Sequence, residues 1–571
     1  AWRDLERACP WTTVYQTWDF VSRWYATYAA HYHPCLVVQR DAGGRLVGLL
    51  PLAVPVQGGG PIVAGSYHAE YQVWLARAGE GERFIPAALD ALVQAGIRST
   101  LLFTYLPPQT PVAWLAPGMP WAARAEHLRL PRPLAAMGDG SSFKQSLKKK
   151  GNKSKISRLE RIGKLRLEEI TDPERLAALF DEIERYGTLR IGALRNVAVL
   201  AGDPDKKAFY LRLMRETPLL HVTVLWAGEQ MLSAHIGVRD GANVVLTIFT
   251  HAPFHARHSP GKLHLLYLGV LLAEQGVANL DLTPTGDYKD RFASHHDDVG
   301  RLQLFLSTGA QRKYELARRG REAVKTLLRA TGRSPEEART AARGVASRLA
   351  RVRPGDVPRM VWRRVAPALH YSRELRIYTY DVEAAKALAA PAVMRRDQVP
   401  DILAYRPELA SEATVQQFLR ACLERLEEGQ HLYTRVEAGS LAHYGWLIDR
   451  QERSFMVEVG QILQLPPDSA VLYGFYTRQS ARGRGYYHAS LRQMVGDAAR
   501  IPGTKHIWIS VLADNGPSRH TIEKVGFTYR FSFFERRTLG RLRRWTNAPA
   551  EFVGAAAGPA AVPAAPGAAD E

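Results

Sequence analysis

Short apolar runs typical of buried strands recur along the chain, and amphipathic stretches typical of helices lie between them. Near the start, the runs Cys35–Gln39 and Leu46–Pro51 flank a glycine-containing turn, which is a hairpin signal. A helix is predicted over Ile85–Ala95 and a strand near Leu101–Tyr105. The pattern therefore indicates a mixed α/β unit over about residues 1–140.

A second α/β unit is predicted over residues 141–310, opening with a basic helix at Phe143–Ile162. Its predicted strands are Leu220–Trp226, Gln230–Val238, Val244–Thr250 and, after one apolar helix, Ala278–Leu282. A third unit is predicted over residues 371–545, with strands at Leu472–Tyr476 and His506–Val511. The final segment, 546–571, is mostly Ala, Pro and Gly, and we expect it to be disordered because it has few large apolar side chains.

Composition narrows the class of protein. The 571 residues are 46% hydrophobic and 23% charged, as in ordinary globular domains. The three cysteines, Cys9, Cys35 and Cys422, form no CxxC pair, which excludes a disulfide framework and disfavours a cysteine-rich zinc site. No run approaches the ~20 apolar residues of a membrane span, and no signal-peptide pattern opens the chain. We therefore expect a cytoplasmic protein without a membrane span.

The formal net charge of +20 is concentrated in one segment. Arg312–Arg364 contains 16 Lys and Arg against five Asp and Glu, a local net charge of +11. This segment lies within residues 311–370, which we interpret as a basic, helical connector between domains. A solvated helical face is the more common meaning of such a segment, and binding of an anionic partner is the alternative.

The clearest motif lies in the third unit. The strand Leu472–Tyr476 is followed by Arg482-Gly-Arg-Gly485 and then by a predicted helix. A glycine-rich turn at the start of a helix exposes backbone N–H groups that can hold a pyrophosphate. The turn has neither the Gly-x-Gly-x-x-Gly pattern nor a Gly-Lys-Ser/Thr end. About thirty residues later, a second strand leads to Asn515-Gly-Pro-Ser518 and to Lys524-Val-Gly-Phe527.

Both motifs, in this order, resemble the GNAT superfamily of N-acetyltransferases. The resemblance implies an acyl-CoA co-substrate, acetyl-CoA or another acyl-CoA, whose pantetheine contacts Asn515. It also implies that the CoA pyrophosphate binds the backbone amides around Arg482, Gly483, Arg484 and Gly485.

The third unit departs from the GNAT pattern at two positions. Tyr487 stands where the loop usually ends in a small residue, and Ile522 stands where many members have a tyrosine as general acid. Glu458, on a strand predicted over Phe455–Val459, is the carboxylate that could act as a base. The alternative is that Glu458 is an inward-facing glutamate held in a salt bridge.

Residues 1–310 carry a second resemblance. The basic stretch Ser146–Lys155, the motif Ser259-Pro-Gly-Lys-Leu263, Asp281 at a strand end and Gly286-Asp-Tyr-Lys289 are similar to the CelD/BcsL-type acetyltransferase family. That family is associated with cellulose and exopolysaccharide synthesis and is related to Fem-type aminoacyl transferases. The resemblance implies a tandem pair of GNAT-like units at 1–140 and 141–310.

The candidate site of this tandem unit has two parts. Ser259 can cap a helix that begins with proline, which leaves free amides to face an anion. The resemblance places the turn of Ser259 and Gly261 where other GNAT proteins bind CoA. Asp281 and Lys289 follow a short strand and can converge on a cleft, as catalytic groups. The alternative for Asp281 is a helix cap or an ion pair with Lys289 or Arg291.

The whole sequence thus predicts an α/β (α+β) protein with three GNAT-like units, the first two in tandem and the third joined through the connector. The expected activity is transfer of an acyl group from acyl-CoA to an amine or hydroxyl, on a small molecule or sugar, without a metal. Two alternatives stay open. One is a non-catalytic or regulatory partner of a polysaccharide machine. The other is a Fem-like transferase that uses aminoacyl-tRNA, with Arg312–Arg364 as the RNA-binding surface.

Overall fold

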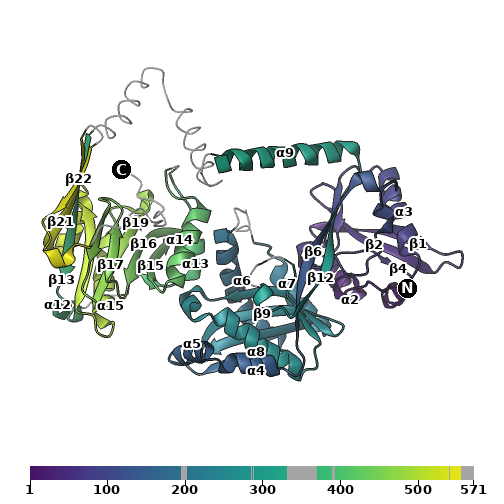
Figure 1. Cartoon of the computed structure of the whole chain (residues 1–571), viewed down its shortest axis with the longest axis horizontal. Coiled ribbons are helices and arrows are strands. Elements are labelled where there is room, and N and C mark those ends of the chain that lie inside the picture. Colours follow the sequence, from purple (N-terminus) through teal and green to yellow (C-terminus); the bar gives the residue numbers. More distant parts are fainter. Residues whose placement is uncertain are drawn as a thin grey trace, which may run out of the picture. The chain divides into compact units, whose positions relative to one another are not determined.

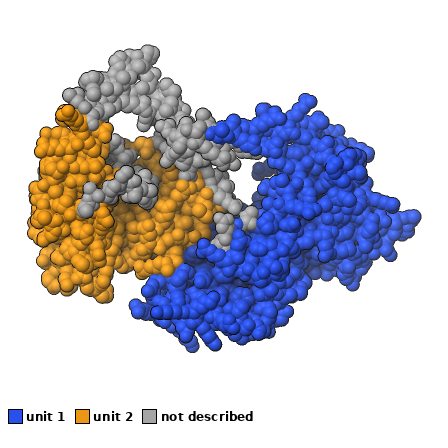
Figure 2. All heavy atoms as spheres, viewed as in Figure 1, with its two compact units in different colours: residues 1–187, 202–252, 258–334 blue, residues 188–201, 253–257, 335–571 orange. Residues whose placement is uncertain are grey.

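The computed structural model describes residues 1–194, 202–284, 286, 289–330, 370–388, 392–409, 411–538 and 541–554. The chain divides into two compact units (Figure 2). Unit 1 comprises residues 1–187, 202–252 and 258–334, and unit 2 comprises residues 188–201, 253–257 and 335–571. Among the described helices, none combines the length and the apolar character needed to cross a membrane.

Unit 1 opens with a small sheet that helices cover. The predicted hairpin is confirmed, because β1 (Tyr32–Arg40) pairs antiparallel with β2 (Leu46–Pro55). β3 (Ile62–Val63) and β4 (Leu75–Ala76) complete this four-stranded sheet. The accompanying helices are α1 (Trp2–Ala8), α2 (Trp18–Thr27) and α3 (Gly81–Gln94). The core between them is rich in aromatic side chains, including Trp74 and Trp114, which meet edge to face.

The large sheet of unit 1 has eight strands in the order β5-β12-β6-β11-β10-β9-β8-β7. Its strands β6, β9 and β12 are labelled in Figure 1. Their bounds are β5 Thr100–Leu106, β6 Ala125–Ala136, β7 Leu165–Ile170, β8 Leu220–Ala227, β9 Gln230–Asp240, β10 Asn243–His251, β11 Asn279–Asp281 and β12 His295–Phe305. β6 pairs with both β11 and β12, so strands from both sides of residue 140 build this sheet. The division into two GNAT-like halves at that residue stays a prediction.

The helices of unit 1 follow the sequence pattern with one correction. The basic helix predicted over Phe143–Ile162 is two helices, α4 (Ser141–Lys148) and α5 (Lys150–Glu160), because Lys149 adopts extended backbone angles. The remaining helices are α7 (Lys206–Glu216), α8 (Pro260–Glu274), α9 (Thr308–Ala330) and α6 (Pro173–Leu194), whose residues from 188 onward belong to unit 2. Apolar side chains of α8 are buried on most sides, against β8, β9, β10 and α4.

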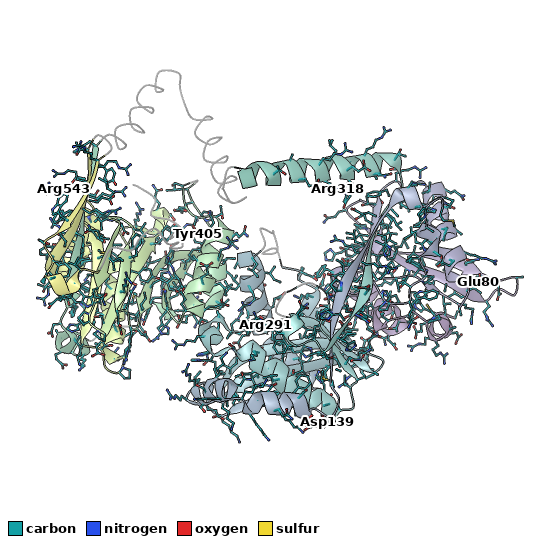
Figure 3. The ribbon with its side chains drawn as sticks, viewed as in Figure 1. Glu80, Asp139, Arg291, Arg318, Tyr405 and Arg543 are labelled. Carbon is teal, nitrogen blue, oxygen red and sulfur yellow. The ribbon has the colours of Figure 1, made fainter. Side chains whose placement is uncertain are left out.

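Of the basic connector, residues 311–330 and residue 370, which begins β13, fall within the described part of the chain. Residues 311–330 of the connector belong to α9. On this helix, Arg318 (Figure 3) forms an ion pair with Glu126 at 3.3 Å. Residues 331–369, which hold most of Arg312–Arg364, lie outside the described part of the chain. The helical connector and its alternative role as an RNA surface therefore stay predictions.

Unit 2 is built on a second eight-stranded sheet, in the order β14-β15-β16-β19-β20-β13-β21-β22 (Figure 1). Its strands are β13 His370–Tyr380, β14 Arg395–Arg396, β15 His431–Glu437, β16 Ser440–Ile448, β19 Ser469–Thr477, β20 His506–Leu512, β21 Thr528–Thr538 and β22 Arg541–Thr546. A separate two-stranded sheet joins β17 (Arg453–Met456) to β18 (Gln461–Gln464). The helices are α12 Val382–Lys386, α13 Val399–Leu403, α14 Val415–Glu427, α15 Tyr486–Arg500 and α16 Gly516–Val525.

The disorder predicted for residues 546–571 was wrong for residues 546–554. Thr546 ends β22, and a short turn of helix at Ala550–Phe552 follows. The ring of Phe552 packs against Phe531 and Trp508, with centroids 4.9 and 5.6 Å away. One aromatic anchor thus orders a stretch of otherwise poor composition, and residues 555–571 lie outside the described part.

The two large sheets share one topology. Read from β7 and from β14, each continues through three antiparallel neighbours to one parallel pair, β10·β11 in unit 1 and β19·β20 in unit 2. In each sheet, a strand from earlier in the chain, β6 or β13, follows that pair. The other neighbouring strands described in these sheets are antiparallel. The last strand differs, since β5 precedes its sheet in the chain whereas β22 ends it.

Candidate functional site

The parallel pair of unit 2 separates partway along its length. β19 and β20 are in register from Ser469 beside His506 to Leu472 beside Ile509. β19 then continues to Thr477 and remains paired with β16 on its other side, while β20 continues beside β13. Beyond Leu472, the edge of β19 that faced β20 is free of ladder pairing among the described strands. Its backbone groups can therefore bind an extended ligand.

A bulge marks the point of separation. The register between β16 and β19 shifts between Tyr444 and Trp446. Opposite this shift, Gly474 has φ +61°, in the left-handed region where glycine carries no steric penalty. A side chain there would also approach the Trp446 ring to 3.2 Å. Glycine thus allows β19 to bend away from β20, as bulges next to binding sites commonly do.

The glycine-rich turn follows β19 and is open to solvent. Residues 482–485 are all exposed, and Gly485 is the residue that precedes α15. Gly483 and Gly485 have φ +78° and +76°, and a Cβ atom at either position would meet nothing within 4 Å. The start of the 15-residue helix α15 therefore presents unobstructed N–H groups, which favour an anion.

The side chains beside this turn are held by one carboxylate. Arg484 Nη1 donates to Glu437 Oε2 at 2.8 Å, and the Tyr486 hydroxyl donates to the other oxygen of Glu437. Glu437 ends β15, so the sheet positions the Arg484 guanidinium next to the turn. The predicted cofactor residues Arg482, Gly483, Arg484 and Gly485 thus lie together at one helix start.

The other residues predicted from the GNAT resemblance have local partners. Asn515 accepts a hydrogen bond from the backbone N–H of Ser518 at 3.1 Å and thereby caps α16. The Tyr487 hydroxyl lies 3.0 Å from the Ser518 hydroxyl, so its ring spans from α15 to α16 and leaves the turn clear. Burial raises the pKa of Tyr487 to about 12. Ile522 is fully buried in the core.

Glu458 does not lie where the sequence predicted. The strand predicted over Phe455–Val459 ends at Met456, and Glu458 occupies the turn between β17 and β18. Those two strands pair only with each other among the described strands. Because the turn residues leave the ladder, Glu458 is not carried on the sheet that contains the separated pair.

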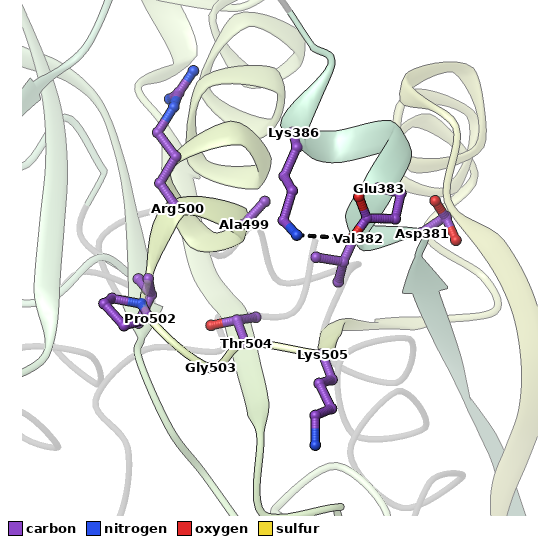
Figure 4. A pocket seen from close by; sticks show the side chains of 11 residues that line it. Asp381, Val382, Glu383, Lys386, Ala499, Arg500, Pro502, Gly503, Thr504 and Lys505 are labelled. Atoms are coloured by element: carbon purple, nitrogen blue, oxygen red, sulfur yellow. Dashed lines mark hydrogen bonds and ion pairs between the residues drawn. The ribbon is translucent and has the colours of Figure 1, made fainter.

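A pocket of about 580 Å³ lies at the far end of α15 from the glycine turn (Figure 4). It is lined by the last residues of α15, by α12 and by residues 501–505. Lys386 points toward Glu383, with which it pairs at 2.7 Å, rather than toward an empty centre (Figure 4). A 15-residue helix is roughly 22 Å long, so this pocket is separate from the candidate site.

Unit 1 has the same kind of opening with different chemistry. β10 and β11 are in register from Asn243 beside Asn279 to Val245 beside Asp281, and β10 then continues to His251. The register between β9 and β10 also shifts here, between Leu246 and Ile248. The last residue of the parallel pair is therefore Asp281, a carboxylate at the point of separation.

Asp281 is buried and fully partnered. Its carboxylate accepts from the Tyr71 hydroxyl at 2.6 Å, from Arg132 Nη1 at 3.2 Å and from the Thr283 N–H at 2.8 Å. Burial raises its pKa, and the Arg132 charge and the Tyr71 hydrogen bond oppose that shift. The predicted alternative of an ion pair was correct in kind, but the partner is Arg132 rather than Lys289 or Arg291.

Lys289 joins this cluster through a shared neighbour. Its Nζ donates to the Thr283 hydroxyl at 2.9 Å and to the Thr283 carbonyl at 3.2 Å. The side chain is 8% exposed, and burial lowers its pKa while Glu70 and Asp281 oppose that shift. Asp281 and Lys289 therefore both bond to Thr283, and their role as catalytic groups that line a cleft stays a prediction.

Glu70 is a member of this cluster that sequence reasoning missed. It is half-buried between the buried residues Ala69 and Tyr71, and its carboxylate makes no hydrogen bond within the described residues. Burial raises its pKa to about 7, Lys289 lowers it, and Asp281 raises it further. A single glutamate outside any motif carries no sequence signal, so only the fold could have revealed it.

The Ser259 turn of unit 1 has neighbouring side chains against it, whereas the glycine turn of unit 2 has free space around it. Ser259 adopts a left-handed backbone (φ +53°) and caps nothing; its hydroxyl accepts from Lys155 Nζ at 2.7 Å. A Cβ atom on Gly261 would lie 3.3 Å from His251 Nδ1. The pKa of Lys155 is lowered by burial and by Lys262. Positive charge, rather than free glycine amides, thus marks the start of α8.

Two regions match a known kind of domain. Residues 147–291 and residues 374–528 each match a family model described as acetyltransferase (GNAT) domain. The first match contains β10, β11 and the start of α8, and the second contains β19, β20 and the glycine turn. A search of the curated proteins found no match.

Several solved structures resemble parts of the chain at low identity. FemX is 10% identical, covering 55% of this chain and 97% of its own, with a TM-score of 0.37. L-PGS from Bacillus licheniformis is 10% identical, covering 51% and 92%, with a TM-score of 0.32. A tandem GNAT protein from the clavulanic acid biosynthesis pathway is 12% identical, covering 66% and 99%, with a TM-score of 0.21. The sheets show that this is a mixed α/β protein, and the two family matches show that it carries two acetyltransferase (GNAT) domains.

Proposed function

We propose that this protein is an acyltransferase whose unit 2 binds an acyl-CoA, with acetyl-CoA as the simplest such donor. The observation that carries the proposal is the exposed turn Arg482–Gly485 placed directly after the freed edge of β19. Gly485 also begins α15, but a turn that only begins a helix needs no open space above both of its glycines.

The two features fit the two ends of the donor. The pyrophosphate of CoA, an anion, binds the amides at the start of α15, with the Arg484 guanidinium beside it. The pantetheine arm is an extended chain with two amides, and it lies along β19 over Tyr473–Thr477 as an added strand would. This arrangement brings the thioester to the point where β19 and β20 separate.

Transfer then requires attack by an amine or hydroxyl on the thioester carbon. A freed N–H of β19 near the bulge at Gly474 is placed to donate to the oxyanion of the tetrahedral intermediate. The nucleophile must also lose a proton to a base. The acceptor class, a small amine or a sugar, is proposed from the sequence resemblance alone.

For unit 1 we propose a CelD/BcsL-type acyl-transfer site that serves cell-envelope or exopolysaccharide metabolism. Its support is the cluster of Asp281 and Lys289 at the separation of β10 and β11. At the start of α8, Lys155 and Lys262 provide positive charge for an anionic donor in place of glycine amides.

A second candidate for unit 2 is a CoA-binding domain without turnover. Ile522 is buried where many GNAT proteins place a general acid, and the Tyr487–Ser518 contact bridges the starts of the two helices. Release of the CoA thiol in the presence of amine and sugar acceptors separates the candidates, because a binding domain leaves acetyl-CoA intact.

The experiment that tests the proposal compares Gly485→Glu with Gly485→Gln by calorimetric titration of CoA into the full chain. Both substitutions impose the same side-chain size on a left-handed position, and only glutamate adds an anion. We expect Gly485→Glu to weaken CoA binding by at least ~100-fold and Gly485→Gln to weaken it less. Unchanged CoA affinity in a Gly485→Glu protein with a normal melting temperature would exclude this turn as the binding site.

A further inference from the structure

The outer strands of the unit 2 sheet are strongly basic. β13, β21 and β22 together carry eight arginines and no lysine, against two glutamates, Glu374 and Glu535. β22 is the last strand in the order of this sheet, and it pairs only with β21 among the described strands. Figure 1 labels these three strands, and Figure 3 labels Arg543 on β22. This edge of the sheet therefore concentrates positive charge.

On one face of these strands, the arginines have a carboxylate between them. Residues that lie directly opposite each other in antiparallel strands project to the same face of the sheet. Glu535 lies opposite Arg373 of β13 and opposite Arg544 of β22. Its carboxylate accepts from Arg544 Nε at 2.7 Å and from the Tyr371 hydroxyl. This face therefore has an anion of its own among its arginines.

On the other face, two arginines meet without a carboxylate. Arg536 of β21 lies opposite Arg543 of β22, and Ser372 of β13 lies on its other side. The carboxylate on this face, Glu374, pairs instead with Arg376 at 2.9 Å. No ion pair joins Arg536 or Arg543 to a carboxylate of the described residues. Like charges directly opposite each other destabilise a sheet, so a bound anion would stabilise this face.

A stacked pair of rings lies beside the two arginines. Phe534 and Trp545 are opposite each other in β21 and β22, with ring centroids 5.1 Å apart and ring planes 6° apart. The guanidinium carbons of Arg536 and Arg543 lie 5.5 and 5.9 Å from the centre of the Trp545 ring. The arginines are exposed and the rings are half-buried. We name these four residues, together with the exposed Arg541 two positions before Arg543, the arginine–tryptophan face.

This combination fits an anion that also carries planar rings. A guanidinium group binds a phosphate through two parallel hydrogen bonds and stacks on flat rings, whereas a lysine acts as a point charge. Sheets with aromatic side chains on one face bind nucleic acids by stacking on unpaired bases. Arg541 and Arg543 are about 7 Å apart along β22, so they can contact successive phosphates of an extended strand.

A membrane surface fits this face less well. Proteins that lie on anionic membranes combine cations with apolar side chains that enter the lipid. The exposed apolar side chain of β22, Leu542, lies opposite Arg537 and is therefore on the other face. Single-stranded nucleic acid is thus the partner that the charges and the rings favour.

We propose that the arginine–tryptophan face binds single-stranded nucleic acid. Its phosphates contact Arg536, Arg541 and Arg543, and one of its bases stacks against Trp545. The face is formed by residues of unit 2 alone, and its use does not depend on the proposed acyl transfer.

The test compares Arg543→Gln with Arg373→Gln in the full chain. Both arginines are exposed, and each lies near one aromatic ring of the same sheet, at 5.9 Å from Trp545 and at 5.3 Å from Tyr371. Only Arg543 belongs to the arginine–tryptophan face. A third variant, Trp545→Leu, keeps an apolar side chain and removes the stacking ring. Fluorescence anisotropy over a range of salt concentrations measures binding of labelled oligo(U) and oligo(dT) of about twelve nucleotides. Inorganic polyphosphate and phosphatidylglycerol vesicles are the comparison ligands.

We expect Arg543→Gln to weaken oligonucleotide binding ~10-fold and to lower the slope of log affinity against log salt by ~0.7, since one phosphate contact is lost. It should also leave the melting temperature of the free protein unchanged or raise it, because a like-charge pair is removed. Trp545→Leu should weaken binding ~10-fold without changing the salt slope. Arg373→Gln should change affinity at most ~2-fold and leave the salt slope unchanged.

Absence of oligonucleotide binding, equal effects of Arg543→Gln and Arg373→Gln, or full affinity in Trp545→Leu overturns the proposal. Polyphosphate or vesicles that bind as tightly as the oligonucleotides also overturn it, because the face then selects charge alone. Photocrosslinking of oligo(U) that carries 5-iodouracil separates this face from the basic connector. Crosslinks at Trp545 or Phe534 support the proposal, and crosslinks confined to Arg312–Arg364 overturn it.

Discussion

The two large sheets share one strand order apart from the last strand, and each opens beside its one parallel pair, yet they place different chemistry at the opening. The last paired residue is Asp281 in unit 1 and Ile509 in unit 2. Unit 1 surrounds its opening with buried ionic groups, and unit 2 follows its opening with exposed glycines. The topology thus determines where a ligand can enter, and the residues at that point determine what the ligand can be.

Histidines extend this contrast. In unit 1 His221, His235 and His264 are buried between the sheet and α8, and burial is the main cause that lowers the pKa of all three. For His221 and His264 it falls to about 4 and about 3. In unit 2, burial also lowers the pKa of His443 to about 4, but at His431 the carboxylates Asp397 and Asp449 outweigh burial and raise the pKa to about 9.

The largest expected effect is therefore a different pH dependence of the two units. Both lose stability in acid, through His221, His235 and His264 in unit 1 and through His443 in unit 2, and unit 2 also loses stability in alkali through His431. Unfolding exposes the three unit 1 histidines, which then bind protons below about pH 6.5. The stability they contribute is complete above that pH and is lost as the pH falls toward 4, on the order of 3 kcal/mol for His221 alone. His431 contributes stability that is complete below about pH 6.5 and is lost as the pH rises toward 9.

Peptide-resolved hydrogen exchange at pH 4.5, 6.5 and 9 measures this contrast within one chain. Peptides from β8, β9 and α8, and to a smaller extent those from β16 with its buried His443, should lose protection at pH 4.5, and those from β15 should lose some at pH 9. Substitution of His264 by the nearly isosteric Gln should reduce the acid loss. If both units lose protection in parallel at every pH, the buried histidines do not cause a difference in pH dependence between the units.

A smaller effect concerns how the two sites are held. Arg132→Met leaves Asp281 buried without its cation, which typically costs about 3–5 kcal/mol. Arg484→Met is the matched change in unit 2, where the pair with Glu437 has a 56% exposed arginine, and we expect about 0–1 kcal/mol. Denaturant unfolding of both variants gives the two values. Equal losses would mean that burial of the charges does not distinguish the sites.

Local features of both sites could be predicted from the sequence. The glycine turn, the strand before it and the helix after it all lie within about thirty residues, and their pattern is visible without a fold. Asn515 also lies in a local motif, and its observed role is the local one of capping α16. Phe552 shows the limit of composition, because one aromatic side chain orders a stretch that composition alone marks as disordered.

Contacts across the sheet could not be predicted. Arg132 and Asp281 are 149 residues apart in the chain, and Tyr71 and Asp281 are 210 apart. Such contacts depend on which strand follows which in the sheet and on register, neither of which leaves a periodic signal in the sequence. The hydrogen bond from Lys155 to the Ser259 hydroxyl, across 104 residues, could not be predicted for the same reason, and it is present in place of the predicted helix cap.

The most direct test of the central claim, that the opening of unit 2 binds the donor along β19 and at the glycine turn, is hydrogen–deuterium exchange with and without acetyl-CoA. We expect saturating acetyl-CoA to slow exchange at Tyr473–Thr477 and at the amides of residues 483–486. Residues 500–505, at the separate pocket beside the other end of α15, serve as the internal control and should be unchanged. Bound acetyl-CoA that protects neither stretch, or that protects residues 500–505 instead, would contradict the claim.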